Sequence, residues 1–484
     1  MNVRAVVAGI ALLVFTVSLI GIVVGAIGLY YAYTQESYVE FVTGLRFIAL
    51  YSIAALLSLP IILSLRRVQT GIIEGFVIIA VSWLVLPLIS AVSYMVTVGF
   101  SFVDAYFESI SGFTGTGLTV MESPQDMPKT VLLWRAITQW IGELGVVVVS
   151  GTFLPLLHRV IKGIYEVERG ARIAPTIIAT TRRLFTIYVV FTFIGTLVLV
   201  AGGMNLFDAL THSMTAIATG GFSTRSESIG YWSWSRVVVV GTMAISIIGA
   251  FNFADNDLLI RGRFRELIHS SELRWFLALL TMLVLATGAA YVVYESELEP
   301  LNAFYIGVYH AISGMTTTGF QVDDLSHTAD QIKALLVLGM VIGGCTFSTA
   351  GGLKIKRVAI ALKNVAWEAA SYFIPPTMML RRRLGREPVD DAYIRSVYNF
   401  IFVYITTLGT ISISISVLGY SFIDSLFETA SALSCVGLSV GVTSMKAPLA
   451  VKLLLITAMY LGRIEFLPLY IAVGRLYARK LRVT

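Results

Sequence analysis

Long runs of apolar residues, separated by short polar stretches, make up most of the chain. Five runs carry at most one charge each: Val6–Gly28, Ile48–Leu65, Ile72–Val98, Leu184–Gly202 and Tyr398–Leu418. Because about 20 apolar residues cross the hydrocarbon core of a bilayer as a helix, each run predicts a membrane-spanning helix. The first run is long for the core of a secretory signal and no small-residue cleavage site stands out, so we expect it to be retained.

A shorter pattern recurs four times between the long apolar segments. FVDAYFESISGFTGTGLTV, which starts at Phe102, recurs as LFDALTHSMTAIATGGFST from Leu206, as AFYIGVYHAISGMTTTGFQV from Ala303 and as SFIDSLFETASALSCVGLSV from Ser421. Each copy leads into a small or polar quartet that ends in a glycine: Gly117, Gly221, Gly319 and Gly437.

The segment before each quartet holds about 12 residues and would span only about 18 Å as a helix, too short to cross a bilayer. We therefore expect each copy to enter the membrane and turn back. Irregular backbone at that depth is tolerated only where protein buries it or water lines it. Four such segments can surround one axis, which is the architecture of a pore.

The pattern predicts an all-α polytopic membrane protein with four pseudo-repeats of helix, re-entrant pore helix and helix around one central pore, plus two additional N-terminal transmembrane helices. The ten expected crossings lie at about 4–33, 44–66, 71–99, 129–158, 178–203, 234–257, 274–295, 331–363, 392–420 and 447–474. The expected domains are residues 1–69 for the N-terminal pair of helices, then 70–170, 171–262, 263–385 and 386–484 for the four pore repeats.

Composition agrees with a membrane protein that is not an enzyme. The chain is 57% hydrophobic and 13% charged, whereas soluble domains carry about 25% charged residues. The sequence lacks the residue spacing of a metal site, a nucleophile elbow and a phosphate-binding loop, so we expect no enzymatic activity. Two cysteines, Cys345 and Cys435, are too few for a disulfide framework.

Lysine and arginine concentrate in alternate loops. The basic loops are Arg66–Arg67, His158–Arg172, Arg261–Arg274, Lys354–Arg386 and Arg475–Arg482, while acidic residues such as Glu40, Glu122 and Glu297 occupy the loops between. Because basic loops favour the cytoplasmic side, both termini are expected in the cytoplasm. The net charge of +6 therefore reports membrane topology, and no nucleic-acid partner is expected.

The quartets suit a dehydrated monovalent cation. Such an ion needs oxygens in place of its hydration shell, and rings of backbone carbonyls supply them in potassium-channel filters. Glycine permits the backbone angles and the close approach that such a ring requires. For a single copy the alternative is a simple turn or a small-residue contact between helices.

The ends of the short helices fit the same interpretation. Each helix directs its negative C-terminal end at the pore. The residues expected to cap the opposite ends are Asp104, Asp208 and Asp424.

These residues resemble the TrkH type of the Trk/Ktr/HKT superfamily of potassium transporters. The resemblance rests on FESISGFTGTGLT, DALTHSMTAIATGGFST, ISGMTTTGF, SLFETASALSCVGLS, IGGCTFSTAGGLKIKR and LGRIE. It implies a prokaryotic plasma-membrane protein in which one chain folds around one potassium pathway. It also implies a homodimer and a cytosolic ring of TrkA-type nucleotide-binding subunits that gates the pore.

The resemblance assigns the ion-binding residues. It implies carbonyl ligands from Gly115, Thr116, Thr219, Gly220, Thr317, Thr318, Cys435 and Val436. It places hydroxyl-bearing Thr114, Thr316 and Ser434 below them. Glycine at all four ring positions favours potassium, with rubidium expected to pass. Because the four segments differ in sequence, selectivity over sodium is expected to be modest.

The stretch GGCTFSTAGG interrupts the expected span 331–363, and its composition is poor for a continuous helix. The family places an intramembrane gating loop here, beneath the filter. The implied gate residues are Gly343, Gly344, Thr346, Ser348, Thr349, Gly351, Gly352 and Lys354. The alternative is a close-packed helix of small residues.

Arg463 lies inside the last expected span, where an ionisable side chain is a functional candidate. The family places it under the filter as a barrier to cations, with Glu465 as a possible partner, while the alternative is snorkelling to the interface. Glu143 is expected to pair with Arg135 or to face the dimer interface. His212 and His310 are expected to be satisfied by hydrogen bonds.

Two functions remain open at this point. The first is channel-like potassium transport that an intramembrane loop and a nucleotide-binding partner gate. The second is secondary transport of potassium coupled to H⁺ or Na⁺. Coupled transporters are built from inverted repeats and broken helices, whereas the repeats here run in one orientation, which disfavours the second function.

Overall fold

The computed structural model describes residues 2–65, 71–145, 177–373, 381–385, 387–466 and 470. Within these residues the fold is almost wholly helical, with one two-residue hairpin in which β1 (Arg383–Leu384) pairs antiparallel with β2 (Glu387–Pro388). The basic loops predicted at 158–172 and 475–482 lie outside the described residues.

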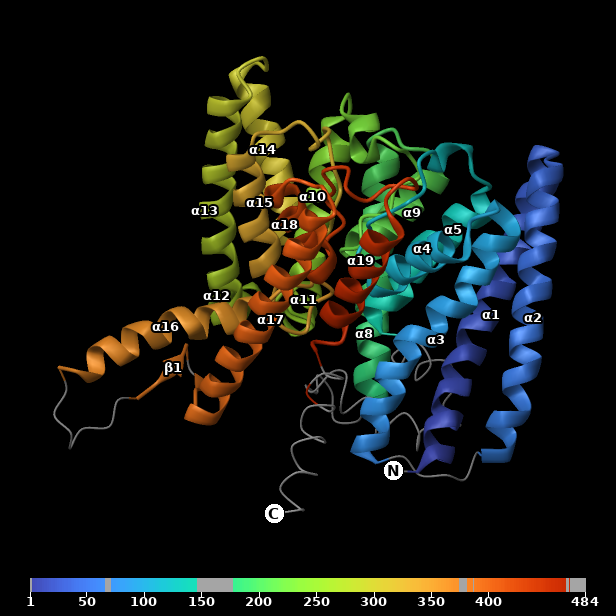
Figure 1. Ribbon diagram of the computed structural model, residues 1–484, viewed down its shortest axis with the longest axis horizontal. Coiled ribbons are helices and arrows are strands. Elements are labelled where there is room, and N and C mark those ends of the chain that lie inside the picture. The colour runs from blue at the N-terminus through green and yellow to red at the C-terminus, as the bar shows by residue number, and fades with distance from the viewer. Residues whose placement is uncertain are drawn as a thin grey trace.

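Six of the described helices are long and apolar enough to cross a membrane. They are α1 (Val3–Gln35), α2 (Tyr38–Leu65), α3 (Ile72–Val98), α8 (Ile177–Ala201), α13 (Ser271–Tyr294) and α17 (Asp391–Val417). Figure 1 shows α1 and α2 side by side at one edge of the bundle, with α13 at the opposite edge. The protein is therefore a multi-pass membrane protein.

Each of the last four long helices is followed by a shorter helix that packs against it. The short helices are α4 (Phe102–Thr114), α9 (Leu206–Ile217), α14 (Pro300–Met315) and α18 (Phe422–Leu433). Each is followed in turn by one further helix, which we call the third helix of its group: α5 (Lys129–Leu144), α10 (Arg236–Ala250), α15 (Asp330–Ile342) and α19 (Leu449–Arg463).

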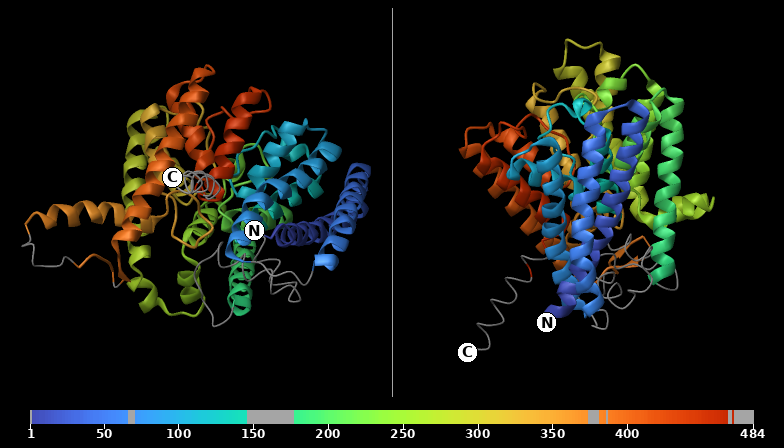
Figure 2. Two further views of the ribbon diagram at one scale, coloured as in Figure 1. Left: turned by 60° about the horizontal axis from the view of Figure 1, so that its bottom comes forward. Right: turned by 90° about the vertical axis from the view of Figure 1, so that its right-hand side faces the viewer.

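The four groups of helices close into a ring. The third helix of each group packs on the short helix of the next, so that α5 contacts α9, α10 contacts α14, α15 contacts α18, and α19 contacts α4. The left panel of Figure 2 shows these groups arranged around the middle of the molecule, with α1 and α2 outside them. The first two helices are joined to the ring by contacts of α1 with α3 and α5.

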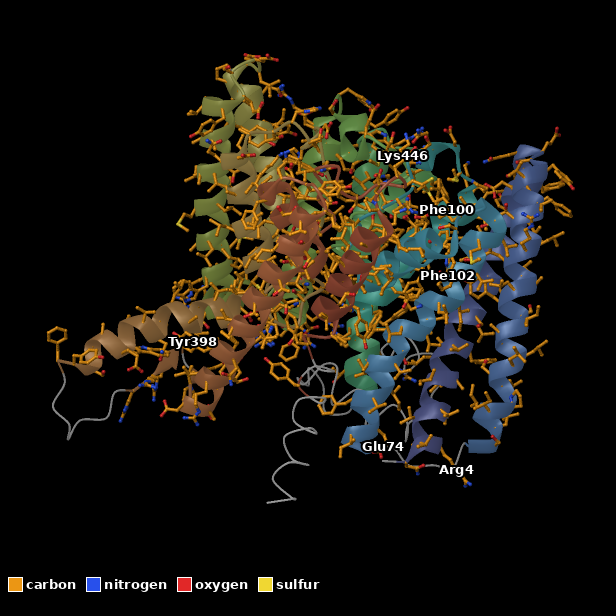
Figure 3. All side chains as sticks on the ribbon, in the orientation of Figure 1. Arg4, Glu74, Phe100, Phe102, Tyr398 and Lys446 are labelled. Atoms are coloured by element: carbon orange, nitrogen blue, oxygen red, sulfur yellow. The ribbon has the colours of Figure 1, made fainter. Side chains whose placement is uncertain are left out.

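The remaining elements lie at the two ends of the bundle. They are the 3₁₀ helices η1 (Pro124–Asp126) and η3 (Ser228–Trp232), and the helices α11 (Phe253–Ile260), α12 (Phe264–His269) and α16 (Ile355–Ser371). In Figure 1, α16 projects sideways from the lower end of the bundle. Figure 3 places Arg4 and Glu74 at that lower end and Lys446 near the opposite one.

Two of the predicted crossings are broken in the middle, and two others end early, α5 at Leu144 within 129–158 and α19 at Arg463 within 447–474. The span 234–257 breaks after Ala250, and α11 leaves α10 at 118°. Asn252 begins α11 as its N-cap, accepting a hydrogen bond from the N–H of Ala254. The span 331–363 breaks at Gly343, whose φ of 72° ends α15. Both breaks free backbone carbonyls that accept hydrogen bonds from residues further along the chain: the Ala250 carbonyl from the Cys345 N–H and the Val341 carbonyl from the Leu353 N–H. The apolar pattern does not reveal these partners.

Candidate functional site

The four short helices lead into the four glycine-ended quartets. We call these quartets the ring segments: Thr114–Gly117, Ala218–Gly221, Thr316–Gly319 and Ser434–Gly437. Each follows directly on the end of α4, α9, α14 or α18. The negative C-terminal end of each helix therefore lies next to its ring segment.

The N-terminal ends of these helices correct one prediction. Ser101 caps α4, accepting from the N–H of Asp104, and Ser421 caps α18 in the same way. Asp104 and Asp424 stand three residues further on, where each accepts a hydrogen bond of 2.6 Å from the capping serine. Asn205 and Asp208 repeat the arrangement on α9. The predicted aspartate caps are wrong because either of two polar residues three apart fits the capping pattern.

Two of these aspartates join neighbouring groups of helices. Asp104 pairs with Lys452 of α19 at 2.5 Å, and Asp424 pairs with Lys333 of α15 at 2.7 Å. Both lysines are buried. The carboxylates thus stabilise the packing between groups at the outer ends of the short helices, away from the ring segments.

The chain leaves each short helix by the same turn. Its first residue is left-handed in every case, with φ of 69° at Gly115, 50° at Thr219, 57° at Thr317 and 55° at Cys435. The N–H of the next residue then bonds back to a helix carbonyl at 2.8–2.9 Å, as Thr116 does to Ser111. This is a helix-ending turn of the Schellman type, and it gives four different sequences one backbone path.

The ring glycines bring the four segments together. A Cβ added to Gly117 would lie 2.0 Å from the carbonyl oxygen of Gly220, and one added to Gly221 would lie 1.9 Å from that of Thr318. One added to Gly319 would lie 2.0 Å from that of Val436, and one added to Gly437 would lie 2.5 Å from that of Thr116. Each glycine thus contacts the carbonyl of the next segment in order, and the fourth returns to the first.

The left-handed backbone of the ring glycines reinforces this requirement. Their φ angles lie between 73° and 101°, a region that side chains strain. Any side chain at a ring glycine would therefore both strain the backbone and displace a carbonyl of the adjoining segment.

The hydroxyl groups predicted below the carbonyls end the helices. Thr114 and Thr316 each donate to a helix carbonyl four residues earlier at 2.7 Å. Ser434 shares a hydrogen bond of 2.6 Å with the Tyr404 hydroxyl. Because the threonine protons go to helix carbonyls, each oxygen acts as an acceptor for the hydroxyl two residues further on, Thr116 or Thr318, at 2.8 Å.

A carboxylate on two of the short helices holds the chain just beyond the ring. Glu108 of α4 accepts from the Thr119 hydroxyl at 2.9 Å and from the Val120 N–H at 3.1 Å. Glu428 of α18 accepts from the Val440 N–H at 3.2 Å. Both carboxylates are fully buried.

Histidine takes this role in the other two groups. His212 of α9 shares a hydrogen bond of 2.9 Å with the Ser223 hydroxyl. His310 of α14 accepts from the Val322 N–H at 3.3 Å. The expectation that both imidazoles are satisfied by hydrogen bonds is confirmed. In all four groups this contact joins residues 11 or 12 positions apart. We name these four contacts the outer clamps.

Gln139 is a site residue that the sequence pattern did not identify. It is fully buried on α5, and its amide donates to the Gly220 carbonyl at 2.6 Å while accepting from the Phe222 N–H at 3.0 Å. The Gly220 carbonyl is the one that adjoins Gly117. Its sequence signal is a single amide side chain within the predicted span 129–158. Because buried polar groups need hydrogen-bond partners, such a residue indicates a polar contact inside the protein.

A cavity of about 240 Å³ lies directly on the ring. Its lining includes the four ring glycines together with Glu122, Arg135, Arg225, Ser439 and Ser444. Lys446, two residues after the cavity-lining Ser444, lies near the end of the molecule opposite Arg4 (Figure 3). The cavity therefore gives access to the ring from the end with the acidic loops.

The stretch Gly343–Lys354 is a loop rather than a helix. Gly351 donates its N–H to the Thr317 hydroxyl at 2.7 Å, and a Cβ on Gly351 would lie 1.8 Å from the Ser434 carbonyl. The Thr349 hydroxyl contacts the Thr219 hydroxyl at 3.2 Å. The loop thus touches ring segments two, three and four at their helix ends, on the side away from the cavity. The alternative of a continuous small-residue helix is wrong.

The other predicted loop residues shape the loop. The Thr346 N–H donates to Glu272 at 2.5 Å, and the Ser348 hydroxyl donates to the Cys345 carbonyl at 2.5 Å. The remaining contacts are Ile355 N–H to the Gly344 carbonyl, the Lys354 amine to the Ala350 carbonyl, and close backbone packing of Gly343 on Gly352.

Arg463 ends α19 and forms an ion pair of 2.7 Å with Glu143 at the end of α5. The expected partners were different. Glu143 does not pair with Arg135, which instead forms an ion pair of 2.8 Å with Glu108. Glu465 pairs with Arg357 instead of Arg463. Sequence neighbours were wrong guides here because α5 and α19 bring together residues 320 positions apart.

Comparisons with known proteins agree with this arrangement. A family model described as a cation transport protein of the TrkH type matches residues 46–477. The chain is 30% identical over 406 residues to an uncharacterized cation transporter of Methanocaldococcus jannaschii, covering 84% of this chain and 83% of the relative.

Relatives with more specific names are equally similar. The chain is 31% identical to the Trk system potassium uptake protein TrkH of Halomonas elongata, covering 84% of this chain and 86% of that one. It is 31% identical to TrkG of Escherichia coli, at 82% and 84% coverage. The crystal structure of the potassium transporter TrkH from Vibrio parahaemolyticus superposes with a TM-score of 0.84 at 24% identity, covering 97% of this chain and 98% of that one. The chain belongs to the TrkH family of cation transport proteins.

Proposed function

We propose that the chain transports potassium across the plasma membrane of a prokaryotic cell through the four ring segments. The observation that carries the proposal is the closed ring, in which each ring glycine adjoins the carbonyl of the third residue of the following segment. Four helix ends add negative potential at the same place. Backbone carbonyls arranged in a ring are the ligands that a dehydrated potassium ion requires.

The four groups of helices are, on this proposal, four pseudo-repeats around one pathway. Their limits would be residues 70–170, 171–262, 263–385 and 386–484, with the pair of helices within 1–69 outside them. With the second helix of each pair counted as a crossing, the chain spans the membrane ten times and both termini lie in the cytoplasm. Ions would enter from the cavity on the ring and pass inward toward the Gly343–Gly352 loop.

The loop is the proposed gate. It contacts three of the four ring segments from the inner side, so an ion leaving the ring inward meets it. A cytosolic ring of nucleotide-binding subunits and a second copy of the chain complete the proposed assembly. Their support is the family to which the chain belongs, in which the relatives are named as components of Trk systems.

Flux measurements test the function directly. The purified chain is placed in vesicles with a potassium gradient as the only driving force, at constant pH and without sodium. We expect potassium efflux that rubidium supports as well. Flux that appears only when a proton or sodium gradient is added would overturn the channel-like proposal in favour of coupled transport. The absence of potassium flux under every condition would overturn both.

A further inference from the structure

The ion pair between Glu143 and Arg463 lies at the inner end of the ring. A Cβ added to Gly115, the first left-handed residue of ring segment one, would lie 2.0 Å from Glu143 Oε1. A Cβ added to Gly462, next to Arg463, would lie 1.9 Å from the Leu433 carbonyl, immediately before ring segment four. The pair therefore bridges the inner ends of segments one and four, and segment one is the segment for which we described no contact with the gating loop.

The contacts of Arg463 hold it to one side. Its Nη1 donates to Glu143 at 2.7 Å and its Nη2 donates to the Gly142 carbonyl at 2.6 Å. The guanidinium also lies 4.9 Å from the ring centre of Trp83 on α3. Glu143 is 2% exposed and Arg463 is 16% exposed. A two-pronged bond to one end of α5 fixes the direction of the guanidinium plane.

Glu143 also balances charge on the inner side. Lys354 lies near both members of the pair and near Arg357 and Glu465, and Arg357 forms an ion pair with Glu465. Among these five side chains, three are cationic and two are anionic. Without the Glu143 carboxylate, three cations would face one anion. A surplus of positive charge next to a narrow conduction path raises the energy of a passing cation.

We propose that Glu143 is a positioning residue for ion passage: it draws Arg463 against α3 and α5 and cancels its charge, and thereby sets how fast cations leave the ring inward. The inference rests on the proposed function, since it requires a cation pathway through the ring. It concerns the carboxylate that this chain carries on α5. Without that carboxylate, Arg463 would keep its charge but lose its ion pair, one of the two bonds that hold it against α5.

A double-mutant cycle in potassium flux tests the inference. The variants are Glu143→Gln, Arg463→Gln and the double variant, each as the full chain in vesicles with a potassium gradient alone. We expect Glu143→Gln to lower the flux about fivefold, since a modest rise in a barrier changes a rate exponentially. We expect Arg463→Gln to raise the flux, and the double variant to match Arg463→Gln because Glu143 acts only through the arginine.

Further variants separate charge from packing. Glu143→Asp keeps the carboxylate and should recover at least half of the flux that Glu143→Gln loses. The loss of flux in Glu143→Gln should also depend on the direction of the potassium gradient. The positive charge left uncompensated on the inner side hinders ions that enter from that side most. A structural defect would lower the flux equally in both directions and in Glu143→Asp. Melting temperatures and size-exclusion profiles of all variants report whether they fold.

Three results would overturn the inference. Unchanged flux in Glu143→Gln would remove the role of the carboxylate. An equal fivefold loss in the Arg463→Gln background would mean that Glu143 acts on the cation directly and not through the arginine. Either of these results, with a wild-type chain that conducts, overturns this inference alone, whereas a wild-type chain without potassium flux overturns the proposed function and this inference with it.

Discussion

The two sides of the ring are built in different ways. On the outer side, the same contact recurs in all four groups of helices, with Glu108, His212, His310 and Glu428 each clamping the chain just past a ring glycine. On the inner side, two of the described features occur once: the loop comes from the third group only, and the Glu143–Arg463 ion pair joins the first group to the fourth. The repeated side is suited to holding a fixed geometry, and the unrepeated side is suited to control.

This difference makes separate predictions for the two sides. Changes on the repeated side should damage conduction or folding in every group. Changes on the unrepeated side should alter the rate while leaving ion preference intact.

The largest effect is expected from a ring glycine. In Gly221→Ala the new Cβ would lie 1.9 Å from the Thr318 carbonyl at a residue with φ of 73°, so the backbone of two segments must shift. We expect potassium flux to fall by about 100-fold, a barrier rise of about 2.7 kcal/mol. Gly409→Ala is the matched control, since nothing lies within 4 Å of its Cβ position. Equal flux in the two variants would refute the ring geometry.

The outer clamps should differ in stability although they share a position. Glu108→Ala leaves the buried Arg135 without its carboxylate, which costs about 3–5 kcal/mol. Glu428→Ala loses only acceptors for hydroxyl and N–H groups, at about 1–3 kcal/mol. Thermal unfolding in detergent measures both, and a larger loss in Glu428→Ala would contradict the pairing.

The gating loop should respond in the opposite direction from the ring. Gly351→Ala places a Cβ 1.8 Å from the Ser434 carbonyl, so the loop must move away from ring segment four. We expect potassium flux to rise, by about tenfold if the obstruction falls by about 1.4 kcal/mol, with the ratio of potassium to sodium flux unchanged. A loss of flux in this variant, measured in the same vesicles, would mean that the loop supports the ring instead of blocking it.

The smallest effect is expected from Gln139. Gln139→Met removes the hydrogen bonds to the Gly220 carbonyl and the Phe222 N–H, and a hydrogen bond contributes about 1 kcal/mol. We expect the preference for potassium over sodium to fall about threefold, while flux stays near the wild-type level. Gln331→Met, at an exposed position on α15, serves as the control. An unaltered preference would reduce Gln139 to a packing role.

The sequence predicted the repeated side well and the unrepeated side poorly. Four glycines at the same place in four similar copies identified Gly117, Gly221, Gly319 and Gly437, because the backbone geometry leaves no other residue at those positions. The order in which neighbouring segments meet follows from the packing of the helices.

The inner contacts depend on tertiary structure that no local pattern encodes. Glu143 and Arg463 meet only because α5 and α19 both end beside the ring, and the nearer candidates Arg135 and Glu465 have partners of their own. The break after Ala250 was missed for a similar reason. Gly249 stands immediately before it, but glycine is also common inside membrane helices, and the freed Ala250 carbonyl is satisfied by the N–H of Cys345 in the gating loop.

The ratio of potassium to sodium flux in Gly117→Ser tests the central claim most directly. The serine Cβ would lie 2.0 Å from the Gly220 carbonyl, so one quarter of the ring must open. With Gly409→Ser as control, we predict that Gly117→Ser lowers potassium flux and brings the ratio toward one. A Gly117→Ser variant that folds and keeps the wild-type flux and ratio would contradict the assignment of the ring as the potassium pathway.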